Sequence, residues 1–333
     1  MNDSDLFYSI PALLKHQPNQ NKDSLLGKGF LTRRGSAMIV GPAGVGKSKF
    51  TQHLAFSMAL GMDFVGIKVN AKSRVLLIQA EDVIDDIAES IQGFVSQMVG
   101  ADKILISELT TNLHMATVDM LVGQDFTKLV DRFCQLSKPD VVIIDPLVAF
   151  IGCDLVDQGA VTSFLRHDLG SVVRRHKCGL ICVHHTKRGD KGGPAVERAF
   201  GGMEFSAFFR GILDLTGDSK EYREVRVKVT KRQRQLQLAD RFGNPTDAIN
   251  ITMGKDTVQW TRNEQCLDSD SGATAGRPRK VPQVEVDRAI AEGRAGGEGE
   301  AEIVGKVAGK FGYSRKQAGR LVKLAAPGKK GRS

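Results

Sequence analysis

The segment GPAGVGKS, residues 41–48, places glycines, a lysine and a serine at the spacing G-x-x-x-x-G-K-[ST]. This spacing is typical of a loop that holds the phosphates of a nucleoside triphosphate, because glycines let backbone amides point inward and the next helix directs its positive N-terminus at the same oxygens. An apolar run precedes the segment and a helical pattern follows it, which argues against a chance glycine turn. The residues predicted to contact ATP are Gly41, Pro42, Ala43, Gly44, Val45, Gly46, Lys47, Ser48 and Lys49.

Two residues of this loop and one distant acid have further predicted roles. Lys47 neutralises the β- and γ-phosphates, and the Ser48 hydroxyl is a ligand for Mg²⁺. The apolar run of residues 141–144 ends in Asp145, so a buried strand delivers a carboxylate to the edge where open α/β sheets bind ligands. We predict that Asp145 holds the same magnesium ion, the alternative being an ordinary acid at a strand end. The predicted cofactors are therefore ATP and Mg²⁺.

Hydrolysis also requires an acid that orients and deprotonates the attacking water. Pro146, rather than such an acid, follows Asp145 in the sequence. The apolar run that begins at residue 74 ends instead in Glu81 and Asp82, which makes these two carboxylates the candidates.

Short apolar runs alternate with helical patterns over residues 35–260, which predicts an α/β domain with a doubly wound, mostly parallel sheet covered on both faces. The last runs are separated by turn residues without helices, so we expect the sheet to end in antiparallel hairpins. Phe50, Leu54 and Met58 recur at helical spacing and predict a helix with one buried stripe. A second helix is predicted over residues 83–98.

The net charge of +9 is distributed unevenly. Residues 271–333 contain 14 Lys or Arg against 6 Asp or Glu, a balance of +8, which leaves 33 against 32, or +1, for residues 1–270. Residues 306–333 contain 9 basic residues and no acid, so a polyanion is the expected partner of this segment, and a solvated, unstructured tail is the alternative. The predicted divisions are an N-terminal arm (1–30), an ATPase domain (31–265), a flexible linker rich in Ser, Gly and Pro (266–284) and a small basic helical domain (285–333).

Three helical patterns follow the linker, and the last two have the form of a helix-turn-helix. Gly312 is predicted to end the second pattern, and Ser314 is a candidate N-cap for the third. The unit is a candidate for binding duplex DNA, and docking on a partner protein is the open alternative. The third pattern is basic and carries Arg315, Lys316, Arg320 and Lys323.

The five cysteines are scattered, and no apolar run is long enough to span a membrane. Acids rather than a basic leader occupy the N-terminus, so no signal peptide is expected. Cys178, Cys182, His184 and His185 lie close in sequence, but successive strand residues point to opposite faces, which disfavours a zinc site. We expect a cytoplasmic protein with reduced thiols and no membrane partner.

The chain resembles the RepA-type plasmid replicative helicases, which are close relatives of the DnaB-like and RecA-like motors. The resemblance implies a ring, usually of six subunits, that hydrolyses ATP at subunit interfaces and pulls single-stranded DNA through its hole. The predicted fold class is then α/β: a RecA-like P-loop ATPase core with a mostly parallel twisted sheet and C-terminal antiparallel hairpins, plus the small C-terminal helix-turn-helix-like unit. The segments that carry the resemblance are GPAGVGKS, AED at 80–82, VVIIDPL at 141–147, LICVHHTKRG at 180–189 and FFRGILDL at 208–215.

The resemblance also assigns roles to single residues. It implies that Glu81 is the general base and that His185 senses the γ-phosphate, a structural hydrogen bond at a strand end being the alternative for the histidine. Arg210 matches the arginine finger that family members insert into the nucleotide site of the neighbouring subunit. Lys231 matches a second basic residue offered across the interface, with Arg232 and Arg234 as less direct matches. The stretch AFGGMEF departs from the family, since relatives often have an arginine beside the glycine.

The glycine-rich basic loop over residues 186–202 follows the sensor strand, where loops facing the channel lie in RecA-type rings. Lys187, Arg188 and Lys191 are candidates for tracking a phosphate backbone, and a flexible loop with spare charge is the alternative. Phe200 is the loop's single aromatic residue, which favours backbone contacts over base stacking.

The expected function is a ring-forming ATPase that translocates on single-stranded DNA, as a replicative helicase of a plasmid, phage or other mobile element. The alternative class is an ATP-switched DNA-binding or regulatory protein without helicase activity. Phosphoryl transfer to a small molecule is a third, less favoured class, because nothing in the sequence suggests an acceptor pocket. The expected partners are single-stranded DNA, duplex DNA through the C-terminal unit, a replication initiator or primase, and further copies of this chain in a homo-oligomer, a hexamer above all.

Overall fold

A computed structural model of the chain describes residues 9–15, 23–100, 102–186, 203–217, 223–240, 242–254, 259–263, 283–311, 318–319 and 321–322. The chain divides into two compact units, Met1–Asp240 with Pro245–Glu264, and Arg241–Asn244 with Gln265–Ser333. None of the helices in the described ranges is long and apolar enough to cross a membrane.

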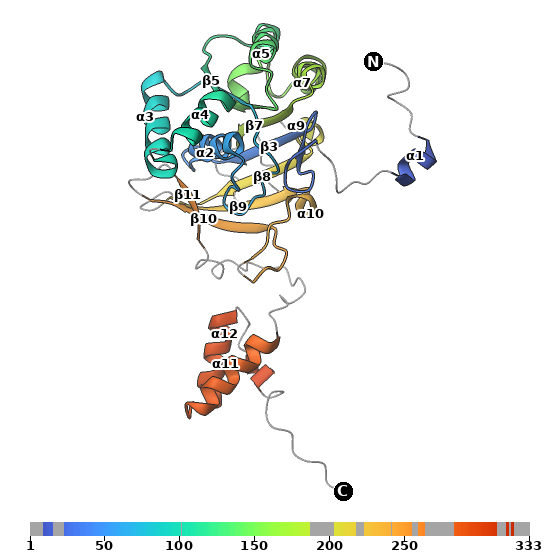
Figure 1. Cartoon of the computed structure of the whole chain (residues 1–333). Helices are drawn as coiled ribbons and strands as arrows, with labels where there is room; N and C mark the ends of the chain where they lie inside the picture. The colour runs from blue at the N-terminus through green and yellow to red at the C-terminus, as the bar shows by residue number, and fades with distance from the viewer. Residues whose placement is uncertain are drawn as a thin grey trace. The chain divides into compact units, whose positions relative to one another are not determined.

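The first unit is built on a nine-stranded sheet, counted over the described residues, with the order β11-β10-β9-β8-β3-β7-β6-β4-β5 (Figure 1). Strands β8, β3, β7, β6, β4 and β5 are parallel neighbours, and β9, β10 and β11 add to them antiparallel. The predicted α/β class, with a mostly parallel sheet and hairpins at its end, is confirmed. The strands are β3 (Ser36–Gly41), β4 (Val75–Gln79), β5 (Leu113–Thr117), β6 (Val141–Asp145), β7 (Gly179–His185), β8 (Gly211–Thr216), β9 (Arg223–Lys231), β10 (Ala248–Met253) and β11 (Trp260–Asn263).

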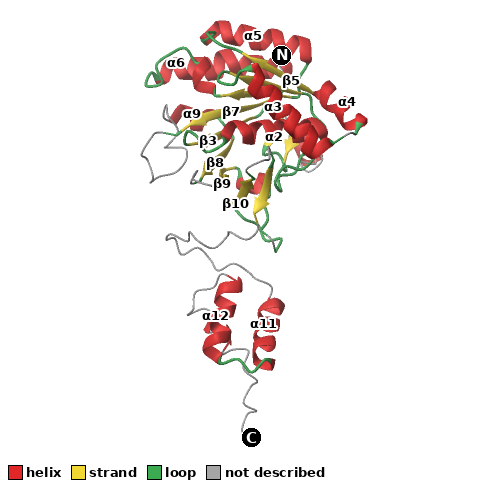
Figure 2. Ribbon diagram, turned by 90° about the vertical axis from the view of Figure 1, so that its left-hand side faces the viewer, coloured by secondary structure: helices red, strands yellow, loops and turns green. Residues whose placement is uncertain are grey.

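Helices cover both faces of this sheet, so its central strands are buried on both sides (Figure 2). One face packs against α2 (Lys47–Leu60), α3 (Ile84–Phe94), its continuation η3 (Val95–Val99) and α4 (Lys103–Asn112). The other face packs against α5 (Gly123–Ser137), η4 (Leu147–Phe150), α6 (Gln158–Thr162), η5 (Ser163–Leu169), α7 (Gly170–His176) and α9 (Met203–Phe208). Two short helices complete the unit, α1 (Ile10–Lys15) and α10 (Gln233–Leu236).

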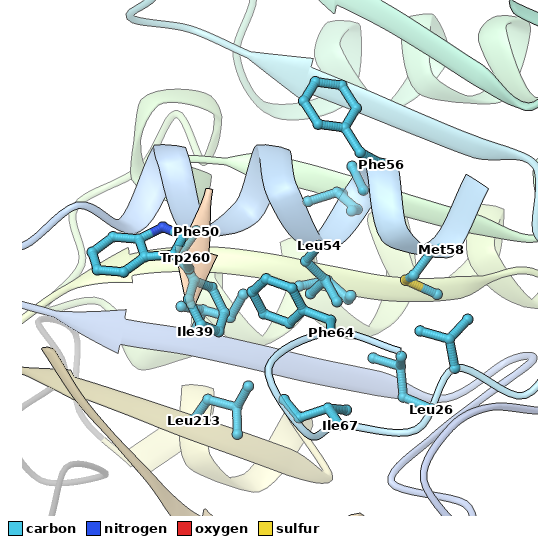
Figure 3. Close-up of a cluster of buried hydrophobic side chains, with 14 of the residues drawn as sticks. Leu26, Ile39, Phe50, Leu54, Phe56, Met58, Phe64, Ile67, Leu213 and Trp260 are labelled. Carbon is cyan, nitrogen blue, oxygen red and sulfur yellow. The ribbon is translucent and has the colours of Figure 1, made fainter. Parts of the chain in front are cut away.

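Helix α2 differs from the sequence prediction of a single buried stripe. Phe50, Leu54 and Met58 are buried as expected, but Gln52 and Ser57 on other sides of the helix are buried as well. The reason is that α2 lies between the sheet and further covering elements, among them the loop carrying Phe64, whose ring meets that of Phe50 edge-on at 4.8 Å (Figure 3). A helix enclosed on all sides has no exposed face for periodicity to reveal.

A small antiparallel hairpin, β1 (Ser24–Leu26) and β2 (Leu31–Thr32), precedes β3. Its side chains Leu25, Leu26, Phe30 and Leu31 belong to the same buried cluster as α2. Leu25, Leu26 and Phe30, which the sequence analysis placed in the N-terminal arm, therefore pack in the core of the first unit.

Trp260, at the start of β11, packs against the beginning of α2 (Figure 3). Its backbone N–H donates to Nδ1 of His53 over 3.0 Å, and its indole lies so close to Gly46 that a Cβ there would be 2.8 Å from Cζ2. Burial lowers the pKa of His53 to about 4, so its imidazole is neutral and can accept this hydrogen bond. The last strand of the sheet thus supports the loop that opens α2.

The second unit contains α11 (Gln283–Ala295) and α12 (Glu300–Phe311). Its own small core is formed by Val286, Ile290, Ile303, Val307, Phe311, Ala318 and Val322. The predicted helix end at Gly312, the N-cap Ser314 and the basic residues Arg315, Lys316, Arg320 and Lys323 lie outside the described residues.

Replacing Trp260 by alanine is expected to lower the free energy of unfolding by about 3–5 kcal/mol, because it removes a buried indole and leaves a cavity beside α2. Trp260→Phe keeps an aromatic ring in the same place and should cost less. Urea denaturation followed by circular dichroism measures both changes. An alanine variant as stable as the wild type would contradict the packing described.

Candidate nucleotide-binding site

The predicted phosphate loop joins β3 to α2 at the carboxyl edge of the sheet. Gly44 and Gly46 adopt positive φ angles of 77° and 93°, a region that costs other residues backbone strain. Gly41 is also required, because a Cβ there would lie 2.7 Å from the carbonyl oxygen of Leu215. Val45, within the loop, is buried in the core. The motif glycines therefore have the conformations that a phosphate-binding loop needs.

The Lys47 ammonium lies over this loop. Its Nζ donates to the carbonyl oxygens of Gly41 (3.0 Å) and Pro42 (2.8 Å). Burial lowers the pKa of Lys47 to about 8, and the negative charges of Asp145 and Glu81 offset part of that shift. Phosphate oxygens are stronger acceptors for an ammonium than backbone carbonyls. The amine is therefore positioned to exchange these carbonyls for a bound phosphate.

Asp145 ends β6 and is nearly fully buried. Burial raises its pKa to about 7, although a hydrogen bond with Ser48 and the charge of Lys47 act in the opposite direction. Among the described residues, none donates a hydrogen bond to its Oδ2. A buried carboxylate oxygen without a partner, next to a serine hydroxyl, is a donor set that suits Mg²⁺. Ser48 and Asp145 therefore fit the metal site predicted from the sequence.

The two candidate acids that follow β4 have different surroundings. The Asp82 Oδ2 accepts hydrogen bonds from the side-chain amides of Gln52 (3.0 Å) and Gln79 (2.7 Å). Glu81 has a side chain that is 66% exposed, and its Oε1 lies 3.9 Å from Nε2 of His185. Asp82 is thus anchored by two amides, whereas Glu81 faces solvent beside the phosphate loop. The sequence analysis missed both glutamines, since neither belongs to a motif.

The two histidines at the end of β7 have distinct positions. His184 is fully buried, donates from Nδ1 to the His185 carbonyl over 2.8 Å, and meets the ring of Phe205 edge-on at 4.5 Å. Burial lowers its pKa to about 4, so it is a neutral core residue. The pKa of His185 is also lowered, by burial and by the charge of Lys47, while Glu81 opposes the shift. His185 is the histidine that reaches the site.

The other predicted site residues lie elsewhere in the same copy. The backbone N–H of Arg210 donates to the Ser36 carbonyl over 3.0 Å, at the start of β3, whereas the phosphate loop follows the end of β3. Lys231 donates from Nζ to the carbonyls of Ser206 (2.6 Å) and Phe209 (2.8 Å), and burial lowers its pKa. The structure therefore groups Lys47, Ser48, Glu81, Asp145 and His185, and it places Arg210 and Lys231 at the opposite edge of the sheet.

Two of the remaining sequence predictions concern Lys49 and the basic loop after β7. Lys49, the last residue predicted to contact ATP, donates to the Ser90 hydroxyl of α3 and so joins α2 to α3. The candidate DNA-contacting residues Lys187, Arg188 and Lys191, with Phe200, lie outside the described residues.

A comparison with protein families agrees with this geometry. The AAA_25 model, described as an AAA domain, matches residues 10–191, more than half of the chain. The chain belongs to the AAA domain family. The matched part of this AAA domain contains Lys47, Ser48, Glu81, Asp145 and His185. No curated protein is found to match the chain.

Membership of this P-loop ATPase family supports an ATP-driven, nucleotide-binding function for the chain. The fold is that of an AAA or RecA-like ATPase core, with the phosphate loop and the acids of β4 and β6 on one edge. When bound, Mg²⁺ would neutralise phosphate charge next to Ser48 and Asp145.

The affinity for Mg²⁺ in the presence of a non-hydrolysable ATP analogue is expected to depend on pH through Asp145. A metal ligand must lose its proton, so affinity should rise about tenfold per pH unit up to the carboxyl pKa of about 7 and level off above it. Magnesium titrations across this pH range measure the effect. Asp145→Asn should bind Mg²⁺ more weakly and lose the step, while Ser48→Ala should weaken binding and keep it; a flat profile for the wild type would contradict the assignment.

Proposed function

We propose that the protein is a ring-forming, ATP-dependent motor that translocates on single-stranded DNA, as a replicative DNA helicase of a plasmid, phage or other mobile element. The observation that carries this proposal is the location of Arg210 on the sheet edge opposite to the phosphate loop of its own copy. A guanidinium placed there is remote from the phosphate loop of its own copy, which supports a role at the nucleotide of a neighbouring copy.

The length of β3 supports this reasoning. Arg210 lies beside Ser36, at the start of β3, and Gly41 ends the same strand. At roughly 3.3 Å per residue, the five steps between them span about 17 Å, which an arginine side chain does not cover. An arginine finger that stabilises the charge of phosphoryl transfer is commonly supplied by another protein chain. The proposed active centre therefore needs two copies of this chain, which favours a ring of identical subunits.

Within one centre, the residues would divide the work as follows. The phosphate loop and Lys47 bind the triphosphate, and Ser48 and Asp145 hold Mg²⁺. Glu81, which is exposed and not anchored by amides, accepts the proton of the attacking water. His185, a neutral imidazole 3.9 Å from Glu81, is positioned to respond to the γ-phosphate. Arg210 of the adjacent copy stabilises the transferred phosphoryl group, and Lys231 holds the backbone that carries this arginine.

The proposed action on DNA rests on charge and on the family resemblance. The basic loop of residues 186–202 would track the phosphate backbone, and the basic C-terminal unit would add a grip on duplex DNA or on an initiator or primase. An ATP-switched regulator would bind the same nucleotide without sustained turnover.

Replacing Glu81 by glutamine is expected to preserve ATP binding and to lower DNA-stimulated ATPase activity by roughly 10²–10⁴-fold, because the water loses its general base. Asp82→Asn is the matched control, since it keeps an acceptor oxygen for Gln52 and Gln79. ATPase assays with single-stranded DNA and strand separation on forked DNA measure both variants. Wild-type protein whose hydrolysis is not stimulated by DNA, and which separates no strands, would favour the switch over the motor.

Arg210→Ala should bind ATP normally and lose roughly 10³-fold or more of its turnover. Mixing this variant with Glu81→Gln tests whether the active centre is shared between copies. Some junctions in a mixed ring pair an intact Glu81 with an intact Arg210, so partial activity should return. If no mixing ratio restores activity, the arginine does not act across a subunit interface.

A further inference from the structure

A row of cations lies along the edge of the sheet where the parallel strands begin, opposite to the edge that carries the phosphate loop. Six strands are neighbours in the sheet order, β9-β8-β3-β7-β6-β4 (Figure 1). Each has a Lys or Arg at or within three residues of this edge in the sequence. Neighbouring strands lie about 4.8 Å apart, so these residues follow one another closely. This cation row consists of Lys231 at the end of β9, Arg210 before β8, Arg34 before β3, Lys177 before β7, Lys138 before β6 and Arg74 before β4.

Three members of the cation row occupy backbone positions that favour glycine. Arg34, Lys138 and Lys177 have φ angles of 60°, 46° and 54°, and their side chains are exposed. A lysine at the end of a helix is favoured by the helix dipole, which accounts for Lys138 after α5 and Lys177 after α7. It does not account for Arg34, which lies in the turn between β2 and β3.

Nearby acids are already engaged by other cations. Asp140 pairs with Arg33 at 2.5 Å and with Arg74 at 3.7 Å. Asp131 pairs with Arg175 at 2.7 Å and with His176 at 2.8 Å. None of the ion pairs formed within the described ranges includes Arg34, Lys138 or Lys177. Their charges remain available at the surface.

The part of the opposite edge formed by β4, β5 and β6 is acidic. Residues 80–100 after β4, 118–127 after β5 and 145–165 after β6 contain Asp and Glu but no Lys or Arg. Several of these acids are exposed, among them Asp85, Asp86, Asp119, Asp154 and Asp157. We call these exposed acids the acidic rim. The ATPase unit is therefore positive along the cation row and negative beyond the ends of β4, β5 and β6, while Lys47 and Lys49 follow β3 at the same edge as these acids.

We propose that the cation row of one copy docks on the acidic rim of the next copy, so that the two opposite edges of the sheet form a head-to-tail contact. The inference rests on the proposed function, because Arg210 belongs to the row and would face the neighbour's nucleotide in the same contact. A nucleic acid would match the row but leave the acidic rim unexplained, whereas a second copy matches both edges. Such an unlike-to-unlike contact generates rings or filaments rather than closed dimers.

The double variant Lys138→Glu/Lys177→Glu tests the docking surface. Assembly of the full chain is measured by sedimentation velocity with Mg²⁺ and a non-hydrolysable ATP analogue, at low and high salt. We expect this variant to need at least about tenfold more protein to assemble than the wild type at low salt, with a smaller difference at high salt because exposed charges are screened. Its affinity for the ATP analogue should be unchanged, which shows that it is folded.

Two further variants sharpen the test. Lys15→Glu/Lys103→Glu makes the same change in charge away from both the row and the acidic rim, at two exposed lysines, and should assemble like the wild type. We call Lys138→Glu/Lys177→Glu the reversed row. Adding Asp85→Lys and Asp119→Lys to it exchanges the signs of the charges at both edges and should restore assembly. Failure of this quadruple variant to recover, with ATP binding intact, would overturn the inference.

The remaining outcomes separate this inference from the proposed function. If the wild type assembles and the reversed row assembles equally well, the docking surface is wrong and the shared active centre stands. If the reversed row assembles normally but loses affinity for an oligo-dT strand, the row binds nucleic acid, which also overturns the inference. A wild type that hydrolyses ATP at full rate as a monomer would end the proposed function as well.

Discussion

Burial of two opposite charges next to the phosphate loop is the constraint around which the site is built. Lys47 and Asp145 are held where desolvation penalises both of their charged forms, and their mutual attraction compensates only in part. Within the described part of the chain, the Oδ2 of Asp145 has no hydrogen-bond partner, and the ammonium of Lys47 is bound to loop carbonyls, so the site holds a buried charge of each sign. A bound triphosphate would bring negative charge to Lys47, and Mg²⁺ would bring positive charge to Asp145.

This constraint explains the arrangement of the sheet. Strands β3, β4, β6 and β7 can bring a loop, two acids and a histidine to one edge because they run parallel and their ends coincide. Lys47 and Asp145 are nearly fully buried at that edge, so their charges interact more strongly than they would in water. The same parallel arrangement leaves Arg210 and its basic neighbours at the other edge, so the polarity of the strands becomes a polarity of the whole unit.

Features that depend on a local pattern of residues could be predicted from the sequence. Each strand of the sheet and the phosphate loop follow from apolar runs and from glycine spacing, and Asp145 follows from its place at the end of a run. Contacts between distant segments were not accessible in this way: the amides of Gln52 and Gln79 on Asp82, the enclosure of α2, and the packing of Trp260 on Gly46 depend on how elements meet in space. The hairpin β1–β2 has strands too short for a periodicity to be recognised.

The contact between Trp260 and Gly46 also bears on how the protein is made. The phosphate motif leaves the ribosome early, but the indole that supports it is encoded about 210 residues later, which corresponds to roughly 10–40 s at ordinary rates of synthesis. During that interval a nascent chain carries the complete motif without the strand that packs beneath it. The strand that supports the phosphate loop thus becomes available only when translation of the ATPase unit is nearly finished.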